Sequence, residues 1–153
     1  MATVAASPIS RLDRGDRVLL EAARRASTRA YAPYSGLKVG AVVRTSQGKL
    51  YHACNVENAS YGLTSCAERN AVFAAVAEEG EGMRVIAIAI FAHADAVSPC
   101  GACRQVLAEF GEDAKVLFPS GDTVRITTVA DLLPEPFKMR RDLGSGGLHS
   151  EGG

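Results

Sequence analysis

Apolar residues recur along the chain with two kinds of spacing, and each spacing predicts one kind of element. Three- and four-residue steps are typical of amphipathic helices, whereas short apolar runs between glycine and proline turns are typical of strands. In chain order, the pattern predicts a helix from Ser10 to about Ala30, strands over Val39–Arg44 and Lys49–Cys54, a helix over Cys66–Glu79, a strand over Val85–Phe91, a helix over Cys100–Phe110, strands over Val116–Phe118 and Val124–Thr127, and a helical turn over Val129–Leu133. Gly15 favours a start of the first helix near Asp16, and Ser65 and Gly80 are placed to cap and end the second helix.

The order of these elements predicts the fold class. The run from Val85 to Phe91 lacks polar alternation, which is typical of a strand buried on both faces. Together the elements predict an α/β fold with three layers and a mixed sheet of five strands. A chain of 153 residues favours one domain, which we place at residues 1–140. Five of the fifteen glycines fall in the last ten residues, so the segment 141–153 is expected to be a disordered tail.

Charge and composition narrow the class of partners. Lys and Arg together number 17, as do Asp and Glu, so the formal net charge is zero and no broad phosphate-binding surface is expected. The longest apolar run, Val85–Ala92, is too short to span a membrane. The N-terminus lacks the order of a secretory signal, so we expect a cytoplasmic protein with no nucleic-acid or membrane partner. In that compartment the four cysteines indicate metal binding or catalysis rather than disulfides.

Three of the cysteines stand at predicted helix starts. Cys100 and Cys103 are three residues apart, so both thiols lie on one face of a first helical turn, and Cys66 begins another helix. Helix N-termini stabilise thiolates, the form that binds zinc, and three thiolates leave one position of a tetrahedron open for catalysis. A lone C-x-x-C also occurs in redox proteins, but the third cysteine favours zinc. Glu68 lies two residues after Cys66 and could carry protons; alternatively, Ser65 and Glu68 form a capping box.

Six stretches carry a resemblance to a known family in both order and spacing. They are Tyr31-Ala-Pro-Tyr-Ser35, Val39-Gly-Ala41, Cys54-Asn-Val-Glu-Asn-Ala59, Cys66-Ala-Glu-Arg69, Ser98-Pro-Cys-Gly-Ala-Cys-Arg-Gln-Val106, and Leu132-Leu-Pro134 with Phe137. Over roughly residues 12 to 140, the chain resembles the small, homotetrameric, zinc-dependent class of cytidine deaminases. The resemblance implies a three-layer α/β/α cytidine-deaminase-like domain that hydrolyses the amidine C–N bond of cytidine and deoxycytidine in pyrimidine salvage.

The family's residue roles carry over to matching positions as expectations. The resemblance implies one zinc ion per chain on Cys66, Cys100 and Cys103, hydroxide attack from that zinc on C4 of the pyrimidine, and Glu68 as the proton shuttle. It implies that Asn55 and Glu57 hold the ribose 3′-hydroxyl of a free nucleoside. Arg69 and Arg104 are expected to reach the cysteine sulfurs and to offset their charge. The remaining expected substrate contacts are Ala67, Leu37 (where the family usually has phenylalanine), Tyr61 and Phe137. Phe137 is expected to reach a neighbouring subunit of a homotetramer with shared active sites.

Three other functions remain compatible with parts of this pattern. A deaminase of a cytosine-nucleoside antibiotic such as blasticidin S shares the zinc motifs. A non-catalytic domain with a closed four-cysteine zinc site would need Cys54 as a ligand. A nucleic-acid editor is disfavoured by the neutral charge. For Asn55 and Glu57, the alternative is a strand-end turn in which their side chains bind local backbone groups.

Overall fold

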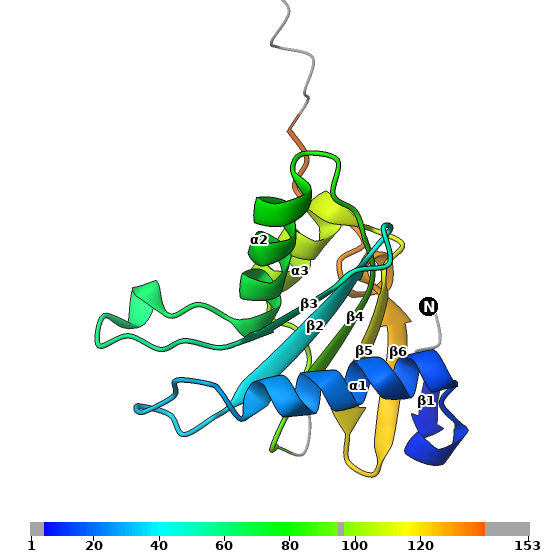
Figure 1. Ribbon diagram of the computed structural model, residues 1–153, viewed down its shortest axis with the longest axis horizontal. Helices are drawn as coiled ribbons and strands as arrows, with labels where there is room; N and C mark the ends of the chain where they lie inside the picture. The colour runs from blue at the N-terminus through cyan, green and yellow to red at the C-terminus, as the bar shows by residue number, and fades with distance from the viewer. Residues whose placement is uncertain (1–4, 95–96, 140–153) are drawn as a thin grey trace, which may run out of the picture.

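A computed structural model of the chain describes residues 5–94 and 97–139 (Figure 1). Its elements are β1 (Ala5–Pro8), α1 (Arg14–Ser27), β2 (Val39–Thr45), β3 (Leu50–Cys54), α2 (Ala67–Glu79), β4 (Val85–Ala92), α3 (Gly101–Phe110), β5 (Lys115–Ser120), β6 (Thr123–Thr128) and α4 (Val129–Leu132), with short 3₁₀ turns at Ile9–Arg11 and Tyr61–Leu63. The expected tail, 141–153, lies outside the described residues.

One mixed sheet forms the middle of the molecule. Its strand order is β1-β6-β5-β4-β2-β3; the β4–β5 pair is parallel and the other pairs are antiparallel. The α/β fold is as predicted, but the expected number of five strands was wrong, because the sheet has six strands within residues 5–94 and 97–139. The extra strand is β1, which pairs with β6 from Ala5 opposite Ile126 to Pro8 opposite Thr123. Four residues without a clear apolar alternation give little strand signal, so the partner strand decides this element.

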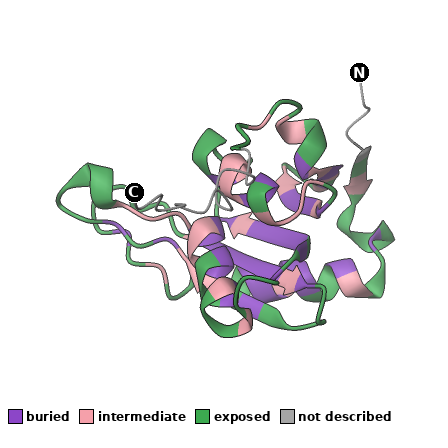
Figure 2. Cartoon of the chain, turned by 90° about the horizontal axis from the view of Figure 1, so that it is seen from above, coloured by how far each residue is buried: buried purple, intermediate pink, exposed green. Residues whose placement is uncertain are grey.

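Helices cover both faces of the sheet and complete the three layers (Figure 1). Leu19 and Ala23 of α1 pack with Val42 and Leu117 on one face. The other face packs against α2 and α3, which lie side by side (Figure 1). Gly40 in β2 permits the close approach of α1, because a Cβ atom there would lie 2.0 Å from the carbonyl oxygen of Ala23. Figure 2 shows the buried residues concentrated in the strands between these layers.

Helix starts differ from the sequence-based expectation in two places. In α1 the N-cap is Asp13, whose side chain accepts a hydrogen bond of 2.7 Å from the backbone N–H of Asp16, so the helix begins after Ser10 and close to the start near Asp16 that Gly15 favours. In α2 the N-cap is Cys66, with no capping side-chain hydrogen bond, so the expected cap by Ser65 is wrong. The hydroxyl of Ser65 is used elsewhere, as described below. Within the described residues, no helix combines the length and apolarity that crossing a bilayer requires.

Two exposed loops extend beyond the sheet next to the start of α2. They are the segments 31–38 and 55–66, which lie side by side at the left of Figure 1. Backbone hydrogen bonds join them: Tyr31 N–H donates to Asn55 O at 3.1 Å, and Glu57 N–H donates to Tyr31 O at 2.8 Å. The second loop also pairs with itself where Val56 and Ser65 exchange backbone hydrogen bonds of 3.0 Å. These pairings fix the loops against the N-terminus of α2.

Candidate active site

The thiols of Cys66, Cys100 and Cys103 converge at the N-terminal ends of α2 and α3. Cys66 and Cys100 are the N-cap residues of the two helices, and Cys103 lies in the first turn of α3. The Sγ atoms of Cys66 and Cys100 are 4.0 Å apart, those of Cys100 and Cys103 are 3.4 Å apart, and all three lie within 4.8 Å of one another. The packing of α2 against α3 therefore assembles residues 34 positions apart into one cluster.

This donor set fits a zinc ion. Thiolates at a zinc–sulfur distance of about 2.3 Å in tetrahedral geometry lie about 3.8 Å from one another. The separations of 4.0 and 3.4 Å bracket that value. Two helix N-termini direct their positive ends at the sulfurs, which favours the thiolate form. Three sulfur ligands occupy three corners of the tetrahedron and leave the fourth for a water molecule or substrate.

The charges around the sulfurs favour a thiolate at Cys66 first. A hydrogen bond from the Cys103 thiol, together with the guanidinium of Arg69, lowers the pKa of Cys66 to about 5. The pKa of Cys103 is raised, because its thiol donates to the Cys66 sulfur and is buried. Arg69 Nη2 lies 3.4 Å from Cys66 Sγ and 3.2 Å from the carbonyl oxygen of Thr64. Because zinc binds thiolates, ion binding must release the remaining thiol protons, and the positive charge of Arg69 assists that release.

Glu68 places a buried carboxyl group next to the sulfur cluster. It lies in the first turn of α2 and is 5% exposed. Burial raises its pKa, and the negative charge of Cys66 raises it further. The capping-box alternative is not formed, since α2 has no capping side-chain hydrogen bond and the Ser65 hydroxyl donates to Asn70 at 2.6 Å. The carboxyl is thus available to exchange a proton with a group bound at the cluster.

The two arginines expected near the sulfurs have different surroundings. Arg69 contacts Cys66, as described above. Arg104 donates through Nε to the carbonyl oxygen of Pro99 at 2.8 Å, through Nη1 to that of Leu132 at 3.0 Å, and through Nη2 to Ser98 Oγ at 3.0 Å. The structure directs its guanidinium at the loop before α3 and at the end of α4 rather than at a sulfur. This loop leads directly into Cys100.

Asn55 and Glu57 are buried, and their side chains hold the neighbouring loop. Asn55 Oδ1 accepts from Val39 N–H at 2.8 Å, and its Nδ2 donates to Leu37 O at 2.9 Å. Glu57 Oε2 accepts from the N–H groups of Tyr34 at 2.8 Å and Ser35 at 3.2 Å, and Oε1 accepts from the Ser35 hydroxyl. These bonds, chiefly that from the Ser35 hydroxyl, lower the pKa of Glu57.

Each of the two side chains keeps unused hydrogen-bonding capacity. A carboxylate has about four acceptor positions and an amide has two N–H donors. The named contacts leave one N–H on Asn55 Nδ2 and one acceptor position on Glu57 Oε1. A hydroxyl group both accepts and donates, so one hydroxyl can satisfy both. The loop-holding role considered from the sequence is therefore present in the structure and is compatible with ligand binding.

The other expected substrate contacts lie on exposed loops or at the start of α2. Ala67 is buried beside Cys66, whereas Leu37 is 42% exposed, Tyr61 76% and Phe137 70%. Tyr61 packs edge-on against Tyr34, with ring centroids 6.0 Å apart. A cavity of about 310 Å³ is lined by Tyr34, Ser35, Glu57, Tyr61 and Thr64. The backbone of Phe137 is held by Gln105, which accepts from its N–H at 3.0 Å and donates to its carbonyl oxygen at 2.9 Å.

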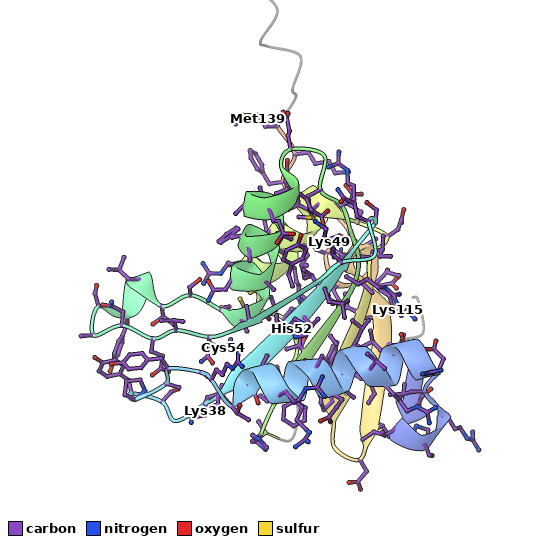
Figure 3. The ribbon with its side chains drawn as sticks, viewed as in Figure 1. Lys38, Lys49, His52, Cys54, Lys115 and Met139 are labelled. Atoms are coloured by element: carbon purple, nitrogen blue, oxygen red, sulfur yellow. The ribbon has the colours of Figure 1, made fainter. Side chains whose placement is uncertain are left out.

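Cys54 lies apart from the sulfur cluster. Together with His52 it lines a cavity of about 470 Å³ between α1 and β3, and Figure 3 shows both residues beside α1. Over the part of the chain that the structure describes, the cysteines able to share one ion are Cys66, Cys100 and Cys103. The position of Cys54 outside the sulfur cluster argues against a closed four-cysteine zinc site.

Sequence reasoning assigned no separate role to three residues that organise the site. They are Ser35, Asn70 and Gln105, which hydrogen-bond to Glu57, to Ser65 and Cys54, and to Phe137, respectively. Ser35 and Gln105 fall inside the stretches that carried the resemblance, which is a signal that could have found them. Asn70 follows Arg69 directly and has no such signal, because its partners lie on other elements.

Comparison with known proteins supports the interpretation of the cluster. The family model described as "Cytidine and deoxycytidylate deaminase zinc-binding region" matches residues 13–119. A cytidine deaminase of Halalkalibacterium halodurans is 47% identical over 126 residues, which cover 79% of this chain and 92% of that protein. One of Sporosarcina psychrophila is 42% identical over 122 residues, with coverages of 78% and 88%. The crystal structure of cytidine deaminase from Burkholderia pseudomallei superposes with a TM-score of 0.73 at 47% identity, covering 82% of this chain and all of that one.

Proposed function

The chain belongs to the cytidine and deoxycytidylate deaminase zinc-binding family, and from that premise we propose that it hydrolyses cytidine and deoxycytidine. The products are uridine and deoxyuridine, with one molecule of water consumed and one of ammonia released. The observation that carries the proposal is the buried Glu68 carboxyl beside three convergent thiols. We assign the activity to pyrimidine salvage in the cytoplasm.

The residues of the chain account for the proton transfers that this hydrolysis needs. A zinc ion on the three sulfurs would supply Lewis-acid activation of the attacking water. Glu68 takes a proton from that water and delivers it to N3 of the pyrimidine, and it then takes the remaining proton from the hydroxyl group added at C4 and delivers it to the departing amine. Its raised pKa suits this shuttle, because a carboxyl that is protonated more easily than usual can both accept and return a proton. Its burial keeps competing water away from the carboxyl.

The ribose end of the substrate is assigned to Asn55 and Glu57. The free N–H of Asn55 donates to the 3′-hydroxyl, and Oε1 of Glu57 accepts from it. The lowered pKa of Glu57 keeps this carboxylate charged at neutral pH. A charged carboxylate beside the ribose repels a phosphate group, so free nucleosides are preferred to nucleotides.

We further propose that the active protein is a homotetramer with shared sites. Phe137 and Tyr61 carry large exposed rings, and Leu37 is an exposed apolar residue of the loop 31–38. Exposed aromatic rings on rigidly held segments are typical anchors of protein–protein contacts. Gln105 holds the backbone of Phe137 from both sides, which keeps the ring directed away from its own core. The Phe137 ring would then close the open side of the neighbouring chain's cavity, the one lined by Tyr34, Ser35, Glu57, Tyr61 and Thr64.

The test is an ultraviolet assay of cytidine conversion with and without a zinc chelator. Conversion that is lost with the chelator and restored by zinc supports the proposal. A parallel assay with blasticidin S separates the nucleoside enzyme from an antibiotic deaminase, because the proposal expects turnover of cytidine to be strongly favoured. A protein that binds zinc but converts none of cytidine, deoxycytidine and blasticidin S would contradict it.

A further inference from the structure

The amide side chain of Asn70 connects two parts of the chain that are distant in the sequence. Asn70 lies in α2, one turn after Cys66, whose carbonyl oxygen accepts from its backbone N–H at 3.1 Å. Its Oδ1 accepts a hydrogen bond from the Ser65 hydroxyl at 2.6 Å. Its Nδ2 donates to the carbonyl oxygen of Cys54 at 2.9 Å. Both polar atoms of the amide are thus used in tying a loop and a strand to α2.

The residues that Asn70 holds lie directly next to the two ends of the site, the metal-binding end at Cys66 and the ribose-binding end at Asn55. Ser65 directly precedes the metal ligand Cys66, and Cys54 directly precedes Asn55 at the ribose end. Backbone hydrogen bonds between Val56 and Ser65 join the same two segments, two residues after Cys54. Asn70 therefore fixes the peptide before Asn55 relative to the helix that carries Cys66 and Glu68.

The separation between the metal-binding end and the ribose-binding end of the site matters because one substrate must reach both ends at once. A nucleoside has a fixed separation between C4 of its base and the 3′-hydroxyl of its ribose. If the peptide between Cys54 and Asn55 shifts, the hydroxyl and the reacting carbon cannot both be in place. The side chain of Asn55 does not prevent such a shift relative to α2, because its named bonds go to the loop at Leu37 and Val39. Small errors in such positioning are costly for binding and catalysis.

We infer that Asn70 is a positioning residue that sets the separation between the ribose-binding end and the metal-binding end of the site. The inference rests on the proposed function, because it takes Asn55 and Glu57 as the ribose end. Asn70 touches no reacting atom, and it acts through the orientation of the Cys54–Asn55 peptide. Its loss should weaken recognition of the 3′-hydroxyl and leave the chemistry at the metal end unchanged.

A purely structural role is the alternative, and the chain offers a matched control for it. The same two elements, β3 and α2, are also joined at their other ends, where the Tyr51 hydroxyl donates to Glu79 Oε1 at 3.1 Å. Tyr51→Phe removes this bond with little change of shape. If Asn70 only helps to dock α2 on β3, Asn70→Ala and Tyr51→Phe should have similar kinetic effects.

The experiment compares cytidine with 3′-deoxycytidine, which differs only at the 3′-hydroxyl, for the wild type, Asn70→Ala and Tyr51→Phe. For Asn70→Ala we expect KM for cytidine to rise about tenfold, equivalent to about 1.4 kcal/mol, with kcat within about twofold of the wild type. Zinc content should be unchanged. The preference in kcat/KM for cytidine over 3′-deoxycytidine should shrink by a similar factor, and Tyr51→Phe should retain the wild-type preference. Alanine favours helix, which limits the loss of stability.

Each contrary outcome identifies which assumption fails. If the wild type converts both nucleosides equally well, the ribose role of Asn55 and Glu57 fails, and the inference fails with it. If the wild type discriminates and Asn70→Ala discriminates as strongly, the ribose role stands and the role of Asn70 is overturned; an equal effect in Tyr51→Phe also overturns it. Should Asn70→Ala not fold, Ser65→Ala removes one of the two bonds. A smaller loss of preference there supports the inference, and an unchanged preference overturns it.

Discussion

Replacing Glu68 with glutamine separates its proposed catalytic role from any role in helix stability. Glutamine has nearly the same shape as glutamic acid, but it cannot take up and release a proton. Because α2 has no capping side-chain hydrogen bond, the substitution removes no helix cap. We therefore expect Glu68→Gln to keep the fold and the zinc and to lose turnover.

The size of the loss follows from the number of proton transfers. One positioned general acid or base typically contributes about 10²–10⁴-fold. Glu68 is assigned to more than one transfer, so we expect kcat to fall by at least about 10³-fold, or about 4 kcal/mol at 1.36 kcal/mol per tenfold change.

Loss of a helix cap would lower the Tm, whereas the Glu68→Gln substitution should leave the Tm unchanged or raise it. Burial raises the pKa of Glu68 in the folded chain above its unfolded value. Stability from this group is fully present below the unfolded pKa and is lost as pH rises through the folded pKa. Glutamine does not ionise, so the Tm of the variant should decline less than that of the wild type as pH rises above the unfolded pKa of the carboxyl, and above the folded pKa the variant should unfold at the same temperature as the wild type or higher.

The assays are cytidine conversion by ultraviolet absorbance, metal analysis and thermal unfolding. Glu78→Gln is the matched control, because Glu78 lies on the same helix and forms an exposed ion pair with Lys49 at 2.8 Å. Its activity should equal that of the wild type. A Glu68→Gln protein with normal specific activity and a lower Tm would refute the proton-shuttle role and favour a structural one.

Three further predictions concern the metal, the assembly and acid stability. Metal analysis should find about one zinc per chain, lost in Cys100→Ala and retained in Cys54→Ser, and loss in the latter would favour the four-cysteine site. Phe137→Ala should raise KM for cytidine and loosen the oligomer at normal zinc content; sedimentation should place the wild type near four times 16.1 kDa, and a fully active monomer would contradict shared sites. The lowered pKa of Glu57 contributes stability above its unfolded pKa that is lost as pH falls through the folded pKa, so Tm should drop less on acidification in Glu57→Gln than in the wild type. Equal drops would show that the hydrogen bonds to Glu57 do not stabilise the fold.

Local patterns in the sequence were sufficient to predict the pairing of Cys100 and Cys103 on one helical turn and most of the elements. Cys100 and Cys103 are brought to one face by the geometry of a single helical turn, and the proline before them predicts that the turn starts there. The buried run that became β4 needed no partner to be recognised, because a strand buried on both faces must be apolar throughout. These features depend on residues a few positions apart, and short-range backbone geometry is encoded directly in the order of residues.

Tertiary structure decided the features that depend on residues far apart in the chain. β1 became a strand because β6 offered a free edge, and Arg104 binds the carbonyl oxygen of Leu132 instead of a sulfur. In each case the polar groups could have formed hydrogen bonds with several alternative partners. Which partner a polar group binds depends on which segments the packing of the sheet and helices brings within hydrogen-bonding distance, about 2.7–3.2 Å. No spacing within one segment specifies that outcome.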